Sequence, residues 1–155
     1  ASRGLGDVYK RQLIDNTRTP FTDIAKRLLI SAGTVHVRVK KMEDAGLIKG
    51  SSLTLDYNKM GYSFIAYVGI YLEKTHQTKY VLERLKEIPY VTVAHITTGK
   101  FNIYCKVRAK TTEHAKEIIF KIDDIDGILR TETMISLEES INDKKRLMHT
   151  IFNDL

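Results

Sequence analysis

Hydrophobic residues between positions 19 and 46 recur at helical spacing and predict two short helices. The first helix has one apolar face, at positions i, i+3, i+4 and i+7, formed by Phe21, Ile24, Ala25 and Leu28. We expect Thr19 to cap this helix and Pro20 to occupy its first position, where the missing N–H is not needed. The segment ISAG at residues 30–33 interrupts the pattern and separates this helix from the next.

The second helix is predicted over residues 32–45. Ser31 precedes it as an N-cap residue, and Gly46 follows it at a position where glycine commonly ends a helix. Its buried stripe consists of Val35, Val39 and Met42. Two short helices separated by about four residues, of which the second is basic, are typical of a DNA-binding helix-turn-helix.

Beyond Gly61 the hydrophobic pattern changes to strands that alternate with helices. Strands are predicted for SFIAYVGIYLE, VTVAHIT, FNIYCKV and ILRTETMIS, and helices for residues 81–88 and 115–122. The order βαββαβ is that of a ferredoxin-like domain, in which both helices cover one face of an antiparallel sheet. The other face is left uncovered, and we expect a second copy of the chain to cover it.

The predicted fold class is therefore α+β with two domains. A helix-turn-helix, winged-helix-like domain occupies residues 13–50, and a ferredoxin-like βαββαβ dimerisation domain occupies residues 63–140. Residues 51–62 alternate and are predicted as a linker strand or hinge, and residues 141–155 as a C-terminal helix or arm. Residues 1–12 make a poor helix pattern, so we expect a non-native or artefactual segment and an incomplete first helix.

Positive charge is concentrated in the part of the chain that contains the two short helices. The net charge is +6, and residues 1–60 carry 11 Lys/Arg against 6 Asp/Glu, whereas residues 61–155 carry 14 against 13. A basic N-terminal third is expected if that part binds the phosphates of double-stranded DNA. No apolar run approaches the roughly 18 residues needed to span a bilayer, so we expect no membrane partner.

The outward side of the second helix supplies candidate DNA contacts. Because the start of a recognition helix meets base edges, we assign this role to the residues Ser31, Ala32, Gly33, Thr34, His36 and Val37. Arg38, Lys40 and Lys41 are assigned to phosphates. Taken alone, the two lysines would fit an ordinary solvated helix face equally well, and Arg38 would fit an ion pair within the domain.

The sequence contains no pattern typical of a catalytic or metal site. The five histidines lack metal-ligand spacing, and no glycine-rich phosphate loop or paired catalytic carboxylates occur. We therefore predict that the chain is not an enzyme and binds no metal. The single Cys105 alternates with Ile103 and Val107, which indicates a buried strand residue, and a lone cysteine suits the reducing cytoplasm.

Three segments resemble the Lrp/AsnC family of feast/famine regulators, and its AsnC-type members most closely. They are TPFTDIAKRLLISAGTVHVRVKKMEDAGLIKG, TTGKFNIYCKV and DGILRTETMIS, and the resemblance extends over about residues 13–137. GTVHVRVKKM followed by AGLI is specific for the recognition helix of that family. The resemblance implies a sequence-specific transcription regulator that binds DNA as a homodimer, assembles into octamers, and responds to an amino acid.

The same resemblance implies where an effector binds. In the family the ligand lies between subunits, against the turn after the second strand of the sensor domain. By position, this nominates Thr98, Gly99, Lys100 and Asn102, with Thr131, Glu132 and Thr133 as further candidates. Lys100 would attract a carboxylate and Glu132 an ammonium group. Many members have Asp where this chain has Asn102; a polar residue there in AsnC-type members makes asparagine the first candidate effector, and no other cofactor is expected.

Two other functions fit part of the sequence. A metabolite-sensing module that regulates an enzyme without binding DNA would leave the basic helix pair unexplained. A DNA-binding protein without an effector would show no response to any amino acid. Because the first helix is predicted to be incomplete, we also expect residues 13–48 to be less stable than the sensor domain.

Overall fold

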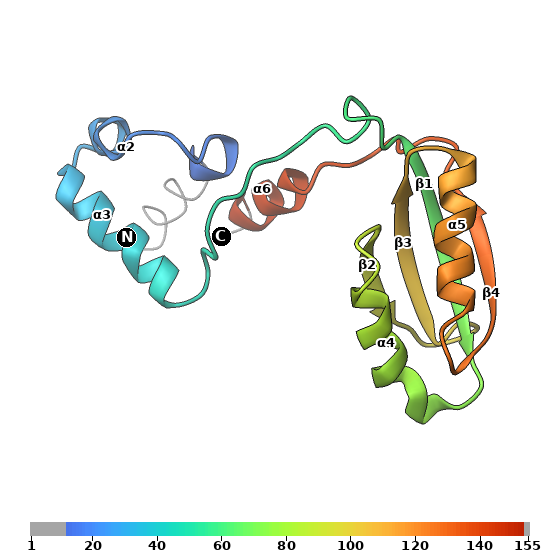
Figure 1. Ribbon diagram of the computed structural model, residues 1–155. Helices are drawn as coiled ribbons and strands as arrows, with labels where there is room; N and C mark the ends of the chain where they lie inside the picture. The colour runs from blue at the N-terminus through green and yellow to red at the C-terminus, as the bar shows by residue number, and fades with distance from the viewer. Residues whose placement is uncertain (1–11, 154–155) are drawn as a thin grey trace. The chain divides into compact units, whose positions relative to one another are not determined.

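The computed structural model describes residues 12–153, which divide into two compact units (Figure 1). The first unit comprises the residues before Leu55 and after Ser140, and the second is Leu55–Ser140. The predicted artefactual segment lies outside the described residues, except for Gln12, which is helical together with residues 13–15. No helix in the described part of the chain has the length and apolar character needed to cross a bilayer.

The first unit is built around helices α2 (Phe21–Leu28) and α3 (Ala32–Asp44). Its core consists of the buried residues Ile24, Ala25, Val35 and Val39. Partly buried hydrophobic residues pack around them: Leu13, Phe21, Leu28, Ile30, Ala32, Met42 and Ile48. Both apolar faces expected from the periodicity therefore meet each other in the structure.

The two ends of α3 are those predicted. The Ser31 Oγ accepts a hydrogen bond from the Thr34 N–H at 3.1 Å, which satisfies one of the free donors at the helix start. At the other end Gly46 adopts φ +72°, and the Leu47 N–H donates to the Met42 carbonyl at 2.9 Å. This left-handed glycine lets the chain turn away from the helix without a side-chain clash.

The predicted start of α2 is wrong. Pro20 takes the cap position itself, since its carbonyl accepts from the N–H groups of Asp23 and Ile24. Thr19 does not cap the helix, because its Oγ1 donates to the Asn16 carbonyl at 2.8 Å. The helix ends at Leu29, which adopts a left-handed conformation with φ +55° although it is not glycine.

The connecting segment forms a turn rather than the strand expected from its alternating pattern. Residues 48–56 have neither helix nor strand. The Asp56 Oδ1 accepts from the Lys59 N–H at 3.1 Å, and the Tyr62 N–H donates to the Tyr57 carbonyl at 2.8 Å. One helical turn therefore begins at Asp56 and ends at Gly61, which adopts φ +86°. These local hydrogen bonds outweigh the strand preference that the alternating pattern indicated.

The C-terminal helix α6 (Lys145–Asn153) belongs to the first unit. Its His149 Nε2 lies 2.9 Å from the Asp15 Oδ1 in the helical turn near the N-terminus. The Lys145 Nζ donates to the Asp15 carbonyl at 3.4 Å. The predicted C-terminal helix or arm is thus part of the same compact unit as α2 and α3.

The second unit has the predicted βαββαβ order. It comprises β1 (Phe64–Leu72), a short 3₁₀ turn η1 (Thr75–Gln77), α4 (Thr78–Lys86), β2 (Val91–Ile96), β3 (Ile103–Ala109), α5 (Thr112–Asp123) and β4 (Ile128–Ile135). The strands form one antiparallel sheet in the order β2-β3-β1-β4. This is the ferredoxin-like arrangement, with the central strands β1 and β3 buried most deeply.

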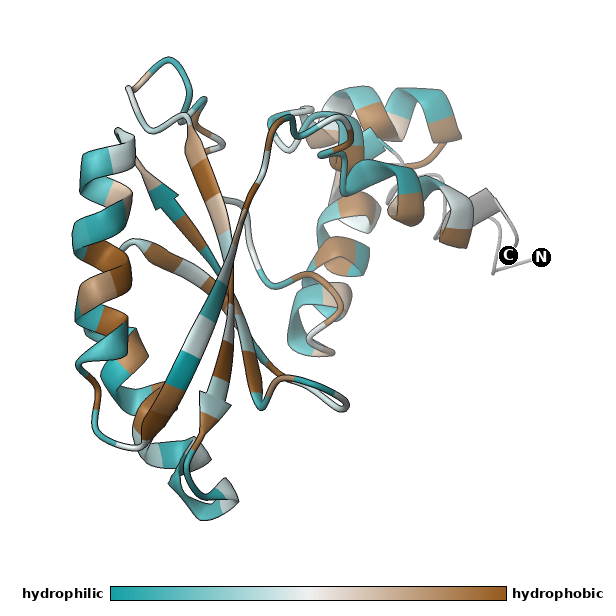
Figure 2. Ribbon diagram, turned by 90° about the vertical axis from the view of Figure 1, so that its right-hand side faces the viewer, coloured by the Kyte–Doolittle hydropathy of each residue, from teal (hydrophilic) through white to brown (hydrophobic). Residues whose placement is uncertain are grey.

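Both helices of the second unit lie on one side of the sheet, as Figure 2 shows. Alternate residues of β1 and β3 form the core with the helices, namely Val68, Ile70, Leu72, Ile103, Cys105, Val107 and Ala109, together with Val81, Leu85, Ala115, Ile118 and Ile122. Their neighbours in sequence point to the opposite side. We call that side the open sheet face; it carries Tyr67, Gly69, Tyr71, Val93, Tyr104, Lys106, Arg108, Arg130, Glu132 and Met134.

Candidate DNA-binding and effector sites

The accessible side of α3 presents most of the residues assigned to DNA. Gly33, His36, Val37, Lys40 and Lys41 are exposed, whereas Val35 and Val39 on the opposite side are buried in the core. The Lys40 Nζ lies 3.5 Å from the Asp44 Oδ1, and both side chains are about two-thirds exposed (64% and 66%). Such a solvated pair contributes little, so Lys40 is able to exchange its partner for a phosphate.

Three other predicted residues hold the start of α3 in place. The Ser31 and Thr34 hydroxyls lie 2.8 Å apart while Ser31 also caps the helix, and Ala32 packs on the core. The Phe21 ring of α2 lies 5.9 Å from the His36 ring, centroid to centroid. The N-terminal part of α3 is therefore fixed by α2 and by its own cap, and it presents Gly33, His36 and Val37 outward. Arg38 is half-buried at the flank.

The turn between β2 and β3 brings Lys100 to Glu132 of β4. The Lys100 Nζ donates to the Glu132 Oε2 at 2.9 Å, and the Tyr71 hydroxyl donates to the Glu132 Oε1 at 3.0 Å. Thr98 and Gly99 are exposed beside them, with Gly99 at φ +92°. These contacts place the two charged groups expected for an amino-acid ligand within reach of each other at one edge of the open sheet face.

The two charges stabilise each other's ionised forms. The hydrogen bond from Lys100, followed by that from Tyr71, lowers the pKa of the Glu132 carboxyl. The hydrogen bond to Glu132 raises the pKa of the Lys100 ammonium group. Both shifts favour the charged forms of the pair.

Asn102 has a structural role at the end of β1. Its side-chain Oδ1 accepts from the Leu72 N–H at 2.9 Å, and its backbone N–H donates to the Ile70 carbonyl at 2.9 Å. The side chain thus extends the β1–β3 pairing beyond the last ladder residues. An Asp at this position would accept the same hydrogen bond.

Thr131 and Thr133 lie on the other side of the sheet from Glu132. The Thr131 Oγ1 donates to the Asp123 Oδ1 at the end of α5, at 2.7 Å. Thr133 lines an apolar cleft of about 160 Å³ under α5, together with Phe64, Thr112, Ala115, Lys116, Ile119, Phe120 and Ile135. The structure therefore separates these two threonines from the Lys100–Glu132 pair, because neighbouring strand residues face opposite sides.

Aromatic residues on the open sheet face were missed in the sequence. The Phe101 ring lies 5.2 Å from the Tyr71 ring and 5.9 Å from the Tyr104 ring, and the Arg130 guanidinium lies 4.1 Å above Tyr71. Phe101 covers Gly69, where a side chain would overlap its ring. Tyr67 and Tyr71 on one face of the first strand were the available signal, since an aromatic row on the face opposite the core is expected to meet a partner surface.

Within residues 12–153, no group of three His, Cys, Asp or Glu side chains gathers in a way that would hold a metal ion. Cys105 is buried in the core, as its alternation with Ile103 and Val107 indicated. Burial raises the pKa of its thiol to about 12.

Comparisons with known proteins identify both units. Residues 65–145 match the Lrp/AsnC ligand binding domain, and residues 11–49 match the winged helix-turn-helix DNA-binding family. Regulatory protein AsnC of Haemophilus influenzae is 37% identical over 84% of this chain and 88% of its own length. The structure of Escherichia coli AsnC gives a TM-score of 0.87 at 33% identity, covering 90% of this chain and 94% of that one. A feast or famine regulatory protein from M. tuberculosis, complexed with L-methionine, shares the fold, with a TM-score of 0.79 at 23% identity over 88% and 92% of the two chains.

These relatives confirm the predicted family and two-domain fold class. They are named as regulatory proteins and not as enzymes, which confirms that prediction as well. The helix-turn-helix precedes the ligand-binding domain, in the order that the sequence indicated. The chain belongs to the Lrp/AsnC family of transcriptional regulators.

Proposed function

We propose that the chain is a sequence-specific transcription regulator in which α3 binds the major groove of DNA and the second unit binds an amino acid. The observation that carries this proposal is the capped, basic helix α3, whose exposed side bears Gly33, His36, Val37, Lys40 and Lys41. Small and hydrogen-bonding residues at its start suit base edges, and the lysines one turn further suit phosphates. A regulator of this kind would act in the cytoplasm.

The DNA-binding role is tested by removing Lys40 and Lys41 together. If both lysines contact phosphates, the double alanine variant binds a duplex from its own promoter region more weakly. The slope of log K against log salt concentration is then less steep by about two. A matched control replaces Lys79 of α4 and Lys121 of α5, which are exposed and change the net charge equally. Equal effects of both pairs would favour nonspecific attraction, and no effect of either would favour the metabolite-sensing alternative.

The effector is proposed to bind at Lys100 and Glu132. These side chains already pair in solvent, so a free amino acid would exchange partners with them: its carboxylate would take Lys100 and its ammonium group Glu132. The exchange exposes no new charge. Thr98 and Gly99 offer backbone at the same turn, whereas Asn102 acts by fixing the turn to β1.

Asparagine is the first candidate, and methionine belongs in the same panel because a structural relative is a complex with it. Calorimetry with each amino acid is expected to detect binding that Glu132→Gln abolishes. Glu87→Gln, which removes the exposed pair with Arg84 on α4, is the control and is expected to bind normally. Binding that survives Glu132→Gln would place the effector elsewhere.

The open sheet face is proposed to pair with a second copy, and dimers to assemble further into octamers. No helix of the described second unit covers it, and it includes the exposed side chains of Val93 (43%) and Met134 (45%). Val93→Glu is expected to dissociate the dimer in sedimentation experiments, whereas Tyr80→Glu on α4 is not. A stable dimer of the Val93→Glu variant would rule out this face.

A further inference from the structure

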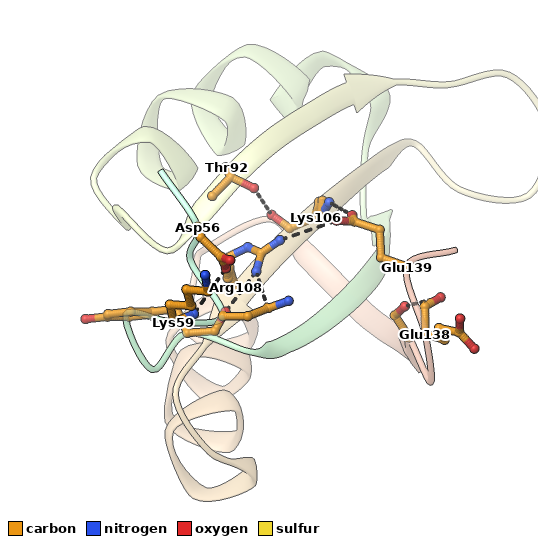
Figure 3. Close-up of polar contacts among 10 residues, drawn as sticks. Asp56, Lys59, Thr92, Lys106, Arg108, Glu138 and Glu139 are labelled. Atoms are coloured by element: carbon orange, nitrogen blue, oxygen red, sulfur yellow. Dashed lines mark hydrogen bonds and ion pairs between the residues drawn. The ribbon is translucent and has the colours of Figure 1, made fainter. Parts of the chain in front are cut away.

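The chain passes between its two units twice, and both connecting segments contact strand β3 of the second unit. The unit boundaries lie at Thr54–Leu55 and at Ser140–Ile141. Lys106 and Arg108 are alternate residues of β3 on the open sheet face. Arg108 contacts the segments that adjoin both boundaries, and Lys106 contacts the outgoing one (Figure 3).

Arg108 holds the incoming segment. Its Nη1 donates to the Tyr62 carbonyl at 2.8 Å and to the Asn58 Oδ1 at 3.3 Å. Its guanidinium also lies 5.2 Å from the centroid of the Tyr57 ring. The Arg108 side chain is only 11% exposed, so its charge is largely removed from water and depends on these partners. The turn at residues 56–62 is thereby fixed to β3.

Glu139 holds the outgoing segment to the same strand. Its Oε2 accepts from the Lys106 Nζ at 2.6 Å, and its Oε1 lies 3.7 Å from the Arg108 Nη2. The Lys106 and Glu139 side chains are 20% and 25% exposed. The ion pairs along the helices of this unit, such as Arg84 with Glu87, are more exposed (48% and 59%). Because the Glu139 contacts are partly buried and charge-assisted, we expect them to hold a more fixed geometry than those surface pairs.

We propose that Lys106, Arg108 and Glu139 form a clasp that fixes both connecting segments on the second unit, and that Arg108 is a positioning residue for DNA binding. Two flexible tethers alone would leave the DNA-binding unit free to sample many orientations. Holding both connecting segments at one strand restricts where the DNA-binding unit is attached. In a dimer, once one α3 is bound, this restriction raises the effective concentration of the other α3 at its half-site. This inference rests on the proposed function of α3.

The clasp itself is tested by hydrogen exchange in the full chain. The amides of Met60, Gly61 and Tyr62 donate to backbone carbonyls within the turn at residues 56–62. Arg108→Met is expected to speed their exchange about tenfold or more while β1 and β3 exchange normally. Arg84→Met, which removes an ion-paired arginine of α4, is the matched control and leaves the turn unchanged. Unchanged exchange at the turn in Arg108→Met would overturn the clasp.

Its consequence is tested with two duplexes that differ in half-site spacing. One carries half-sites one helical turn apart, and the other has about five base pairs inserted, which turns the second half-site to the opposite side. The wild type is expected to prefer the first at least tenfold, and Arg108→Met is expected to reduce this preference to about twofold without changing affinity for a single half-site. An unchanged spacing preference in Arg108→Met would overturn the positioning role.

Two further variants separate the possible causes. Glu139→Gln keeps the size of the side chain and releases only the outgoing segment, so it is expected to give an intermediate spacing preference even if Arg108→Met folds poorly. Arg108→Lys keeps the charge but loses the planar fork, and is also expected to be intermediate. If the wild type itself binds neither duplex, the proposed function of α3 has failed, whereas the exchange experiment still decides whether the clasp exists.

Discussion

Leu29 is expected to destabilise the first unit, so that its replacement by glycine makes the protein more stable. Leu29 follows α2 with φ +55° and ψ 43°, and its side chain is 93% exposed. A left-handed conformation costs an L-residue about 1–2 kcal/mol, which glycine does not incur. Against this gain, glycine costs about 0.5–1 kcal/mol more backbone entropy on folding than leucine does. Removing the solvated leucine side chain costs almost nothing, because it buries almost no apolar surface. The net expectation for Leu29→Gly is a gain of about 0.5–1 kcal/mol.

Native-state hydrogen exchange of the α2 and α3 amides measures this gain directly. Slower exchange by about two- to fivefold is expected for Leu29→Gly, since 1.4 kcal/mol corresponds to a factor of ten. Leu29→Ala is the control: it removes the same exposed side chain but keeps the strain, and so it is expected to leave exchange nearly unchanged. Equal slowing in both variants, or faster exchange in Leu29→Gly, would refute the argument from backbone strain.

Three further predictions concern the second unit and its relation to the first. Gly69→Ala is expected to lower the free energy of unfolding by about 1–3 kcal/mol, because the new methyl group would overlap the Phe101 ring; chemical denaturation that gives the wild-type value would contradict this. Cys105, with its pKa raised to about 12, is expected to resist alkylation at about pH 8 until the unit unfolds, and its burial favours the folded state less as pH rises from the ordinary thiol pKa towards 12; rapid labelling of native protein would show the thiol to be accessible. In the described chain the first unit has four fully packed core residues and the second twelve, so exchange of α2 and α3 amides is expected to exceed that of β1 and β3, and uniform protection would exclude this order.

The long periodic elements were predictable because their burial pattern and their local signals agree. Ser31 and Gly46 mark the ends of α3 both in the sequence and in the structure. The alternation of Ile103, Cys105 and Val107 sets the buried side of β3, and the two helical stripes then have to cover that side. In each of these elements, propensity and packing favour the same conformation.

The errors occurred where short-range hydrogen bonds compete with periodicity. Residues 51–57 alternate like a strand, but Asp56 and Gly61 close a capped turn that no pairing strand opposes. Thr19 is a residue type that commonly caps helices, yet its hydroxyl donates a hydrogen bond to the Asn16 carbonyl instead. Alternatives of this kind differ by only about 1 kcal/mol, which a pattern of apolar residues does not resolve.

The candidate sites were only partly predictable for a different reason. The residues on the outward side of α3 follow from the helical period alone, so their exposure could be derived from Val35. The pairing of Lys100 with Glu132, 32 residues apart, depends on strand order and register, as does the contact of Glu139 with Lys106. Such long-range juxtapositions require the three-dimensional topology.

We expect amino-acid binding in the second unit and DNA binding by α3 to be coupled in one protein. The most direct measurement is the affinity of the full chain for its own promoter duplex, at several salt concentrations, with and without each amino acid. The account predicts specific, salt-sensitive binding that one amino acid changes by a factor of about 5–150, with the same factor recovered when DNA is present during amino-acid titration. An affinity for promoter DNA that no amino acid alters, or an amino acid that binds equally well with and without DNA, would contradict it.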